Sequence, residues 1–266
     1  MSALPYWHVD AFADRPFTGN QAAVMPLTSW LPDKTLQAIA EENSFAETAF
    51  VVRDTNGAAD WELRWFTPTS EVALCGHATL AAGHVLLNRD GGDAVTFRTR
   101  KAGILEVRAM EQGYELALPI TRVEENQLPS LLSALHVKAP LYESVSGAED
   151  TTIVLLEDEA AVRDLQPDMR ALGKINRMVI CTAPGEDYDI VSRVFVPAWG
   201  VPEDSVTGSA HAALAPFWAE KLGRDTISAY QASRRGGILQ CRMDGERVWL
   251  GGPCVTVVEG LFHLPE

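Results

Sequence analysis

Cysteine is scarce in this chain of 266 residues, and the spacing of the four that occur excludes the frameworks that cysteine usually builds. No two of them form a C-x-x-C pair; they stand at Cys75, Cys181, Cys241 and Cys254. Disulfide scaffolds and zinc knuckles need closely and regularly spaced cysteines. We therefore expect a reduced, cytoplasmic protein that is stabilised by the packing of its core.

The chain also has few basic residues and no long apolar run. The chain has 22 basic against 36 acidic residues, a formal net charge of −14. Nucleic acids and anionic membranes bind proteins through basic patches, so we expect neither as a partner. No run reaches the roughly 18 apolar residues of a membrane-spanning helix, and the first residues show no secretory signal.

Several common catalytic motifs are missing as well. The sequence has no G-x-S-x-G nucleophile elbow, no P-loop and no glycine fingerprint for a dinucleotide. The spacing of its histidines, cysteines and acidic residues does not match a metal site, and we expect none. Any chemistry must therefore come from a less familiar arrangement of side chains.

What the chain does contain is an internal duplication. Three segments of the first half recur in the same order in the second half. The glycines of the last two segments are 27 positions apart in the first half and 29 positions apart in the second. The pairs are Phe66-Thr67-Pro68 with Phe195-Val196-Pro197, Cys75-Gly76-His77 with Thr207-Gly208-Ser209, and Gly103-Ile104-Leu105 with Gly237-Ile238-Leu239. Matches in one order at nearly equal spacing indicate two copies of one unit.

Each copy is predicted to contain one buried, alanine-rich helix flanked by strands. The two helices are expected over residues 78–87 and 210–222, preceded by outer helices over 33–43 and 159–170. Strands that surround such a helix are the simplest way to bury it. We expect an α+β protein of two domains, residues 1–118 and 119–266, with the alternative that the last strand returns to the first domain.

The two duplicated turns are the expected place for a ligand. Gly76 and Gly208 let the backbone approach a ligand closely, and the free N–H groups of a helix start attract anions. The alternative is that both glycines only permit packing of the helix against a strand. Because each turn also carries a polar side chain, we favour binding of a small carboxylated molecule.

Four side chains near these turns could transfer protons. Glu47 lies between apolar neighbours at the start of a strand, although it could be an ordinary surface glutamate. His77 faces either a ligand or a partner in the core. Asp204 could instead be a turn residue, and Ser209 could be the N-cap of a helix.

Four ordered segments resemble the phenazine biosynthesis PhzF-like family along essentially the whole chain. They are Phe17-Thr18-Gly19-Asn20-Gln21-Ala22-Ala23-Val24, the Glu47 segment, Leu74-Cys75-Gly76-His77-Ala78-Thr79 and Glu203-Asp204-Ser205-Val206-Thr207-Gly208-Ser209-Ala210. The resemblance implies the fold of diaminopimelate epimerase. In that fold two pseudo-symmetric domains each wrap a strongly curved, barrel-like mixed sheet around a central helix, and the site lies between them. It also implies a homodimer.

The same resemblance implies an isomerase that moves a proton on a small, anionic metabolite without a cofactor. Glu47, His77 and Asp204 match its catalytic positions, and Asn20, Gly76, Thr207, Gly208 and Ser209 match positions that bind the substrate. The alternatives are an amino-acid or hydroxy-acid epimerase of the same fold, or a scaffold that binds a ligand without catalysis. Epimerases of this fold use two cysteines, and Thr207 in place of the second disfavours a two-thiol mechanism.

Overall fold

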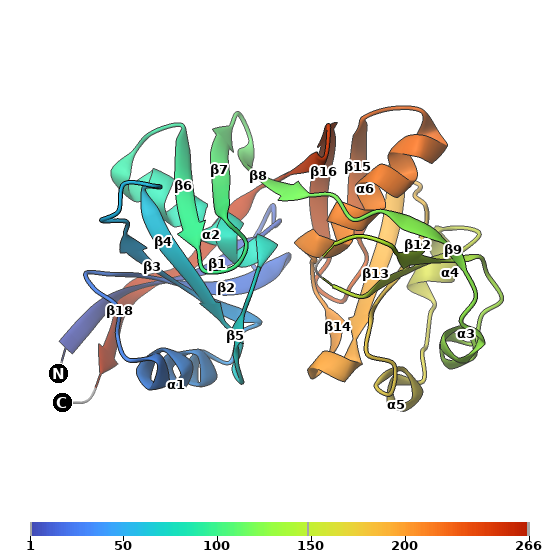
Figure 1. The fold of residues 1–266 in the computed structure, drawn as a ribbon, viewed down its shortest axis with the longest axis horizontal. Coiled ribbons are helices and arrows are strands. Elements are labelled where there is room, and N and C mark those ends of the chain that lie inside the picture. The colour runs from blue at the N-terminus through green and yellow to red at the C-terminus, as the bar shows by residue number, and fades with distance from the viewer. Residues whose placement is uncertain (1, 148, 265–266) are drawn as a thin grey trace. The chain divides into compact units, whose positions relative to one another are not determined.

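A computed structural model describes residues 2–147 and 149–264, and the chain divides into two compact units (Figure 1). The first unit combines residues up to 117 with those from 251 onward, and the second unit spans residues 118–250. The boundary after residue 117 lies one residue before the expected one. The last strand belongs to the first unit, which is the alternative considered above and not the plain division at residue 118.

The first unit is a mixed sheet with two helices. Its strands are β1 (Ser2–Ala11), β2 (Asn20–Leu27), β3 (Glu47–Arg53), β4 (Trp61–Phe66), β5 (Glu71–Val72), β6 (Ala94–Thr99), β7 (Ile104–Met110), β8 (Gly113–Pro119) and β18 (Cys254–Leu264). Helix α1 (Asp33–Asn43) follows β2, and helix α2 (Gly76–Asp90) follows β5. Both helices lie where the sequence predicts them, and α2 begins two residues earlier than expected.

Helix α2 is enclosed by this sheet. Twelve successive residues, Gly76 to Leu87, are buried, and the helix contacts strands β1, β2, β3, β6, β7 and β18 (Figure 1). Its sequence suits such a place because Ala78, Ala81 and Ala82 add little bulk between helix and strands. The predicted arrangement of a sheet around a central helix is therefore confirmed.

The second unit contains the same kinds of element. Its strands are β9 (Val123–Asn126), β10 (Leu141–Ser144), β11 (Thr151–Leu155), β12 (Met178–Pro184), β13 (Ile190–Val196), β14 (Val201–Asp204), β15 (Thr226–Gln231), β16 (Gly237–Asp244) and β17 (Arg247–Gly252). Its helices are α3 (Pro129–Leu135), α4 (Glu159–Arg163), α5 (Met169–Leu172), the 3-10 turn η1 (Pro197–Trp199) and the buried helix α6 (Gly208–Leu222).

The two units share one scheme of strand pairing. In the first unit, β1 pairs antiparallel with β2, β2 pairs parallel with β3, and β3 pairs antiparallel with β4. Strand β4 then pairs antiparallel with β5 and parallel with β6, and β6 pairs antiparallel with β7. Strands β10 to β16 repeat these pairings in the same order and sense. The duplication therefore extends to the whole unit.

The strand that follows each copy pairs with the first strand of the other unit. Strand β9 comes after β8 in the chain but pairs with β10, and β18 comes after β17 but pairs with β1. Residue 2 thereby lies opposite Leu264, and the two ends of the chain meet in one ladder (Figure 1). This exchange explains why the C-terminal strand belongs to the first unit.

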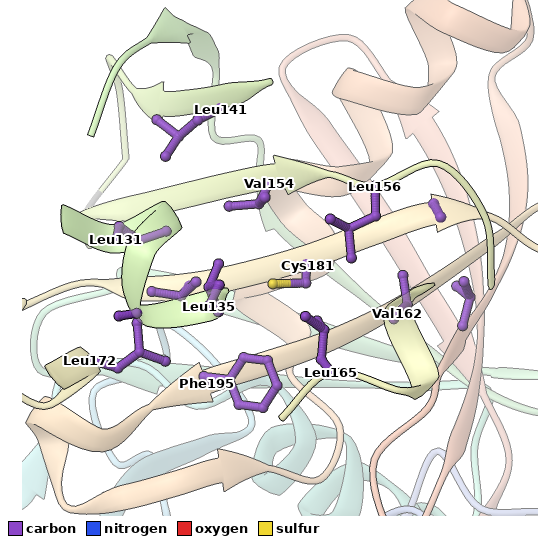
Figure 2. Close-up of a cluster of buried hydrophobic side chains, with 14 residues drawn as sticks. Leu131, Leu135, Leu141, Val154, Leu156, Val162, Leu165, Leu172, Cys181 and Phe195 are labelled. Atoms are coloured by element: carbon purple, nitrogen blue, oxygen red, sulfur yellow. The ribbon is translucent and has the colours of Figure 1, made fainter. Parts of the chain in front are cut away.

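Outer helices cover the sheet of each unit on the face away from the buried helix. In the first unit α1 packs on an apolar cluster from β2, β3 and β4. In the second, Figure 2 shows the cluster that α3, α4 and α5 cover; its labelled members are Leu131, Leu135, Leu141, Val154, Leu156, Val162, Leu165, Leu172, Cys181 and Phe195. No helix among the described residues has the length and apolarity needed to cross a membrane.

The prediction of a single helix over residues 159–170 is wrong. The structure has two short helices, α4 and α5, separated by residues 164–168. Pro167 has no N–H to donate and disfavours a helical conformation before it. Each helix has its own N-cap, because Asp158 accepts from the N–H of Ala161 and Asp168 from that of Ala171.

The close contact of α2 with β7 depends on Gly83. A Cβ atom at this position would collide with both branches of the fully buried Val107 side chain. We expect Gly83→Ala to lower the free energy of unfolding by about 1–3 kcal/mol, although alanine favours the helix itself. Urea denaturation measures this change, with Gly260→Ala as the control because a Cβ there meets open space. In the double variant Gly83→Ala/Val107→Ala, part of the free energy of unfolding lost in Gly83→Ala should be recovered. An equal loss in Gly83→Ala and Gly260→Ala would contradict the steric explanation.

Candidate active site

The start of α2 carries the first group of candidate residues. Cys75 is the N-cap, with an extended backbone, and Gly76 is the first helical residue. Thr79 Oγ1 donates to the carbonyl of Cys75 over 2.5 Å and fixes this end of the helix. The turn therefore holds the next side chain, His77, in a defined and buried position.

Two strand starts bring further side chains to His77. Because β2 and β3 are parallel, Asn20 and Glu47, the first residue of each, lie at the same edge of the sheet. Glu47 Oε2 is 3.0 Å from His77 Nε2, and Asn20 Nδ2 is 3.2 Å from His77 Nδ1. The amide of Asn20 can present either its nitrogen or its oxygen, so it can serve His77 with or without a proton on Nδ1.

The Glu47 carboxylate is mostly buried and pairs with His77. Its side chain is 17% exposed and that of His77 is 5% exposed. The atom Oε2 is buried and lies 3.0 Å from Nε2 of His77. Pairing with an imidazole offsets the cost of burying a carboxylate oxygen.

Burial and the neighbouring side chains together set the protonation of His77 and Cys75. Burial opposes the charged form of His77, but Cys75 and Glu47 outweigh this and raise the pKa of His77 well above 6.5. Burial also raises the pKa of Cys75 to about 11, and the nearby Glu47 adds to the rise. Both neighbours of His77, Cys75 first and Glu47 second, therefore favour its protonated form.

Glu47, Cys75 and His77 are also the residues here that could hold a metal ion. Their ligand atoms all lie within 4.8 Å of one another. They include one carboxylate oxygen, one thiol sulfur and one imidazole nitrogen, which are ligand types of zinc sites. The arrangement can therefore exchange a proton or accept a cation.

The start of α6 carries the second group, in the other unit. Thr207 is the N-cap and Gly208 the first helical residue, the same places that Cys75 and Gly76 have in α2. Asp204 ends β14 and accepts from Thr207 Oγ1 over 2.6 Å and from the N–H of Ser205 over 2.9 Å. Asp204 thus has the turn contacts foreseen as an alternative for it.

Ser209 lies inside α6 and is not its N-cap. Its hydroxyl is 3.8 Å from the sulfur of Met178, which is a weak acceptor. The hydroxyl can therefore serve a ligand without losing a strong internal hydrogen bond. The N-cap alternative for Ser209 is wrong because the helix begins one residue before it, at Gly208.

Sequence reasoning missed Gln231, the buried residue that fixes the second turn. Gln231 ends β15, accepts from the N–H of Thr207 over 2.8 Å, and donates to the carbonyl of Asp204 over 2.8 Å. It is fully buried. Nothing in the local sequence marks this glutamine, because its partners lie more than twenty positions away in the chain.

The structure thus gathers the predicted residues into two groups, one in each unit. The first contains Asn20, Glu47, Gly76 and His77, joined by Cys75. The second contains Asp204, Thr207, Gly208 and Ser209, joined by Gln231. The functional roles of these residues, the homodimer and the cytoplasmic location stay predictions.

Comparison with known proteins shows the family to which the sequence is similar. Residues 9–260 match the family described as phenazine biosynthesis-like protein, PhzC-PhzF. A protein of Pseudomonas aeruginosa named as an uncharacterized isomerase is 47% identical over 265 residues, which cover 98% of this chain and 99% of that protein.

Solved structures agree with the family match. The PhzF-family protein of Enterococcus faecalis is 41% identical and has a TM-score of 0.91, with 99% of this chain and 100% of that one covered. A hydroxyproline epimerase of Agrobacterium vitis shares the fold at 12% identity, with a TM-score of 0.65 and coverage of 97% and 92%. The predicted fold is therefore confirmed.

The raised pKa of His77 can be tested directly. A raised pKa means that the imidazolium adds stability that is complete below pH 6.5 and is lost as the pH rises through the pKa of the folded protein. We expect the His77 signal in NMR titration to move to a pKa lower by about 1–3 pH units in Glu47→Gln, because the stabilising charge is gone. Glu42→Gln, an exposed change on α1, serves as the control. An unchanged titration in Glu47→Gln would show that Glu47 does not hold this proton.

Proposed function

The chain belongs to the phenazine biosynthesis-like PhzC-PhzF family and is an isomerase, and we propose that it moves a proton on a small carboxylated metabolite without a cofactor. Glu47 is the general acid/base in this proposal. The observation that carries it is the pairing of the Glu47 carboxylate, at the partly exposed start of β3, with the buried His77, whose Nε2 lies 3.0 Å from Oε2. A carboxylate beside an imidazole can take up a proton and return it.

In the proposed reaction the Glu47–His77 pair holds the proton between its removal from one carbon and its return to another. Oε2 of Glu47 removes a proton from one carbon of the substrate and returns it to another. The pKa of His77 is raised well above 6.5, and its Nε2 lies 3.0 Å from the Oε2 atom that receives the proton. Asn20 orients the imidazole through Nδ1, which leaves Nε2 toward Glu47.

The remaining candidate residues are proposed to bind the substrate and to assist the proton transfer. Gly76 and Gly208 begin long buried helices, whose free N–H groups attract a carboxylate. This local attraction can outweigh a net charge of −14, because salt screens charges beyond about 10 Å. Thr207 and Ser209 are proposed to contact the substrate, and Asp204 to act as a second group for proton transfer.

Proton transfer by two thiols is a poorer account of this chain. Burial raises the pKa of Cys75 to about 11, so its thiolate is scarce at neutral pH. The equivalent place in the other unit holds Thr207, which has no thiol. Both observations favour a carboxylate base, and with it an isomerisation in preference to two-base inversion of a single stereocentre.

The acid/base role of Glu47 is tested by hydrogen exchange with solvent. Small carboxylated metabolites are incubated with the enzyme in deuterium oxide, and mass spectrometry and NMR follow deuterium and the position of the double bond. We expect Glu47→Gln to lower the exchange rate by about 10²–10⁴-fold while binding persists, and Glu42→Gln to leave it unchanged. Full exchange in Glu47→Gln would overturn the assignment. Inversion at one carbon without a double-bond shift would favour the epimerase alternative.

Ser209 should affect binding more than chemistry. Removing one hydrogen bond worth about 0.5–1.5 kcal/mol corresponds to a rise in KM of about 2–12-fold with kcat nearly unchanged. Steady-state kinetics of Ser209→Ala on a substrate from the exchange screen measures this. Ser133→Ala, at an exposed position of α3, is the matched control. A drop in kcat at constant KM would mean that Ser209 acts in the chemical step instead.

A further inference from the structure

The cluster of Glu47, Cys75 and His77 has the composition of a zinc site. Zinc is bound by cysteine sulfur, histidine nitrogen and carboxylate oxygen, and open zinc sites use three protein ligands with water in the fourth place. All three ligand types are present here, within 4.8 Å of one another. They meet only in the fold, because Glu47 begins β3 whereas Cys75 and His77 begin α2.

The distances place the three ligand atoms near one another, with one side chain to be turned. Bonds of about 2.0–2.3 Å in a tetrahedron separate neighbouring ligand atoms by roughly 3.3–3.8 Å. Here His77 Nε2 lies 3.0 Å from Glu47 Oε2, whereas Cys75 Sγ lies 3.6 Å from Nδ1 and 4.0 Å from Nε2. Binding therefore requires that the Cys75 side chain rotate and bring Sγ toward an ion on Nε2.

Two further features of the cluster suit a cation. Glu47 Oε2 is buried and faces Nε2 of His77 at 3.0 Å, so an ion between the two atoms would replace one contact by two metal bonds. Asn20 contacts the other ring nitrogen, Nδ1, at 3.2 Å. A partner on the second nitrogen of a metal-bound histidine orients the ring and strengthens binding.

We propose that Zn²⁺ binds to Sγ of Cys75, Nε2 of His77 and Oε2 of Glu47, and that bound zinc inhibits the enzyme. A metal ion deprotonates a coordinating thiol, so binding releases the proton of Cys75 to solvent, together with any proton on Nε2. Water completes the coordination, and nothing is oxidised or reduced. Zinc then occupies the carboxylate oxygen assigned to proton transfer.

Metal binding is measured on the full chain after treatment with a chelator. Calorimetry with zinc chloride should show one ion per chain, and Mg²⁺ in excess should not compete, because magnesium avoids thiolate ligands. Cobalt chloride is the spectroscopic probe, since a band of thiolate-to-cobalt charge transfer reports a Co–S bond. We expect this band in the wild type.

Substitutions locate the ion. Cys75→Ser should abolish the cobalt band and lower zinc affinity by more than tenfold, whereas Cys254→Ser, a cysteine outside the cluster, should change neither. Glu47→Gln should also lower zinc affinity by more than tenfold, and Asn20→Ala by about 10–100-fold. Circular dichroism and thermal melting confirm that each variant is folded.

The outcomes separate this inference from the proposed function. Absence of zinc binding, or a cobalt band that survives in Cys75→Ser, would overturn the metal site whatever the enzyme catalyses. The claim of inhibition rests on the proposed function and is tested by deuterium exchange, which should fall as the zinc site fills. Zinc binding without any effect on exchange would overturn inhibition but leave the site. Failure of all exchange, with zinc binding intact, would count against the proposed function alone.

Discussion

The burial of α2 over twelve successive residues constrains the rest of the first unit. A helix that presents no polar face to solvent must be surrounded, and here strands on several sides enclose it. The small side chains of Ala78, Ala81 and Ala82 and the bare backbone of Gly83 let those strands come close. At the start of the helix Cys75 and His77 then meet the starts of two strands.

Burial of this end also sets the electrostatics of the cluster. In a poorly solvated place a lone charge is unfavourable, so groups titrate in relation to one another. The thiol of Cys75 stays neutral, while the opposite charges of Glu47 and His77 support each other. One acidic and one basic group side by side keep this cluster locally balanced in a protein with a net charge of −14.

Much of the architecture could be predicted because it is repeated in the sequence. The segments around Gly76 and Gly208 and the alanine-rich helices carry local patterns that a single sequence displays. The segment Asn20–Leu27 does not, because a nearly continuous apolar run with Pro26 inside has no period of two. The contact of Asn20 with His77 therefore followed only from the parallel pairing of β2 with β3.

Other features depend on long-range contacts. Gln231 looks like any polar residue at the end of a strand until its hydrogen bonds to the Thr207 turn are seen. Strand β18 has exposed positions on both faces, and only its ladder with β1 assigns it to the first unit. The pairing of β18 with β1 is not encoded in either segment alone.

The exchange of final strands has a consequence for how the chain folds. The ladder of β1 with β18 joins the first and the last segments, so its closure carries the entropy cost of the longest loop in the molecule. During synthesis nearly all residues of the first unit are made early, but its last strand is made only after the whole second unit. Until then the backbone edge of β1 is unprotected, as edges prone to aggregation are. The first unit is therefore completed only when its C-terminal strand β18 has been made.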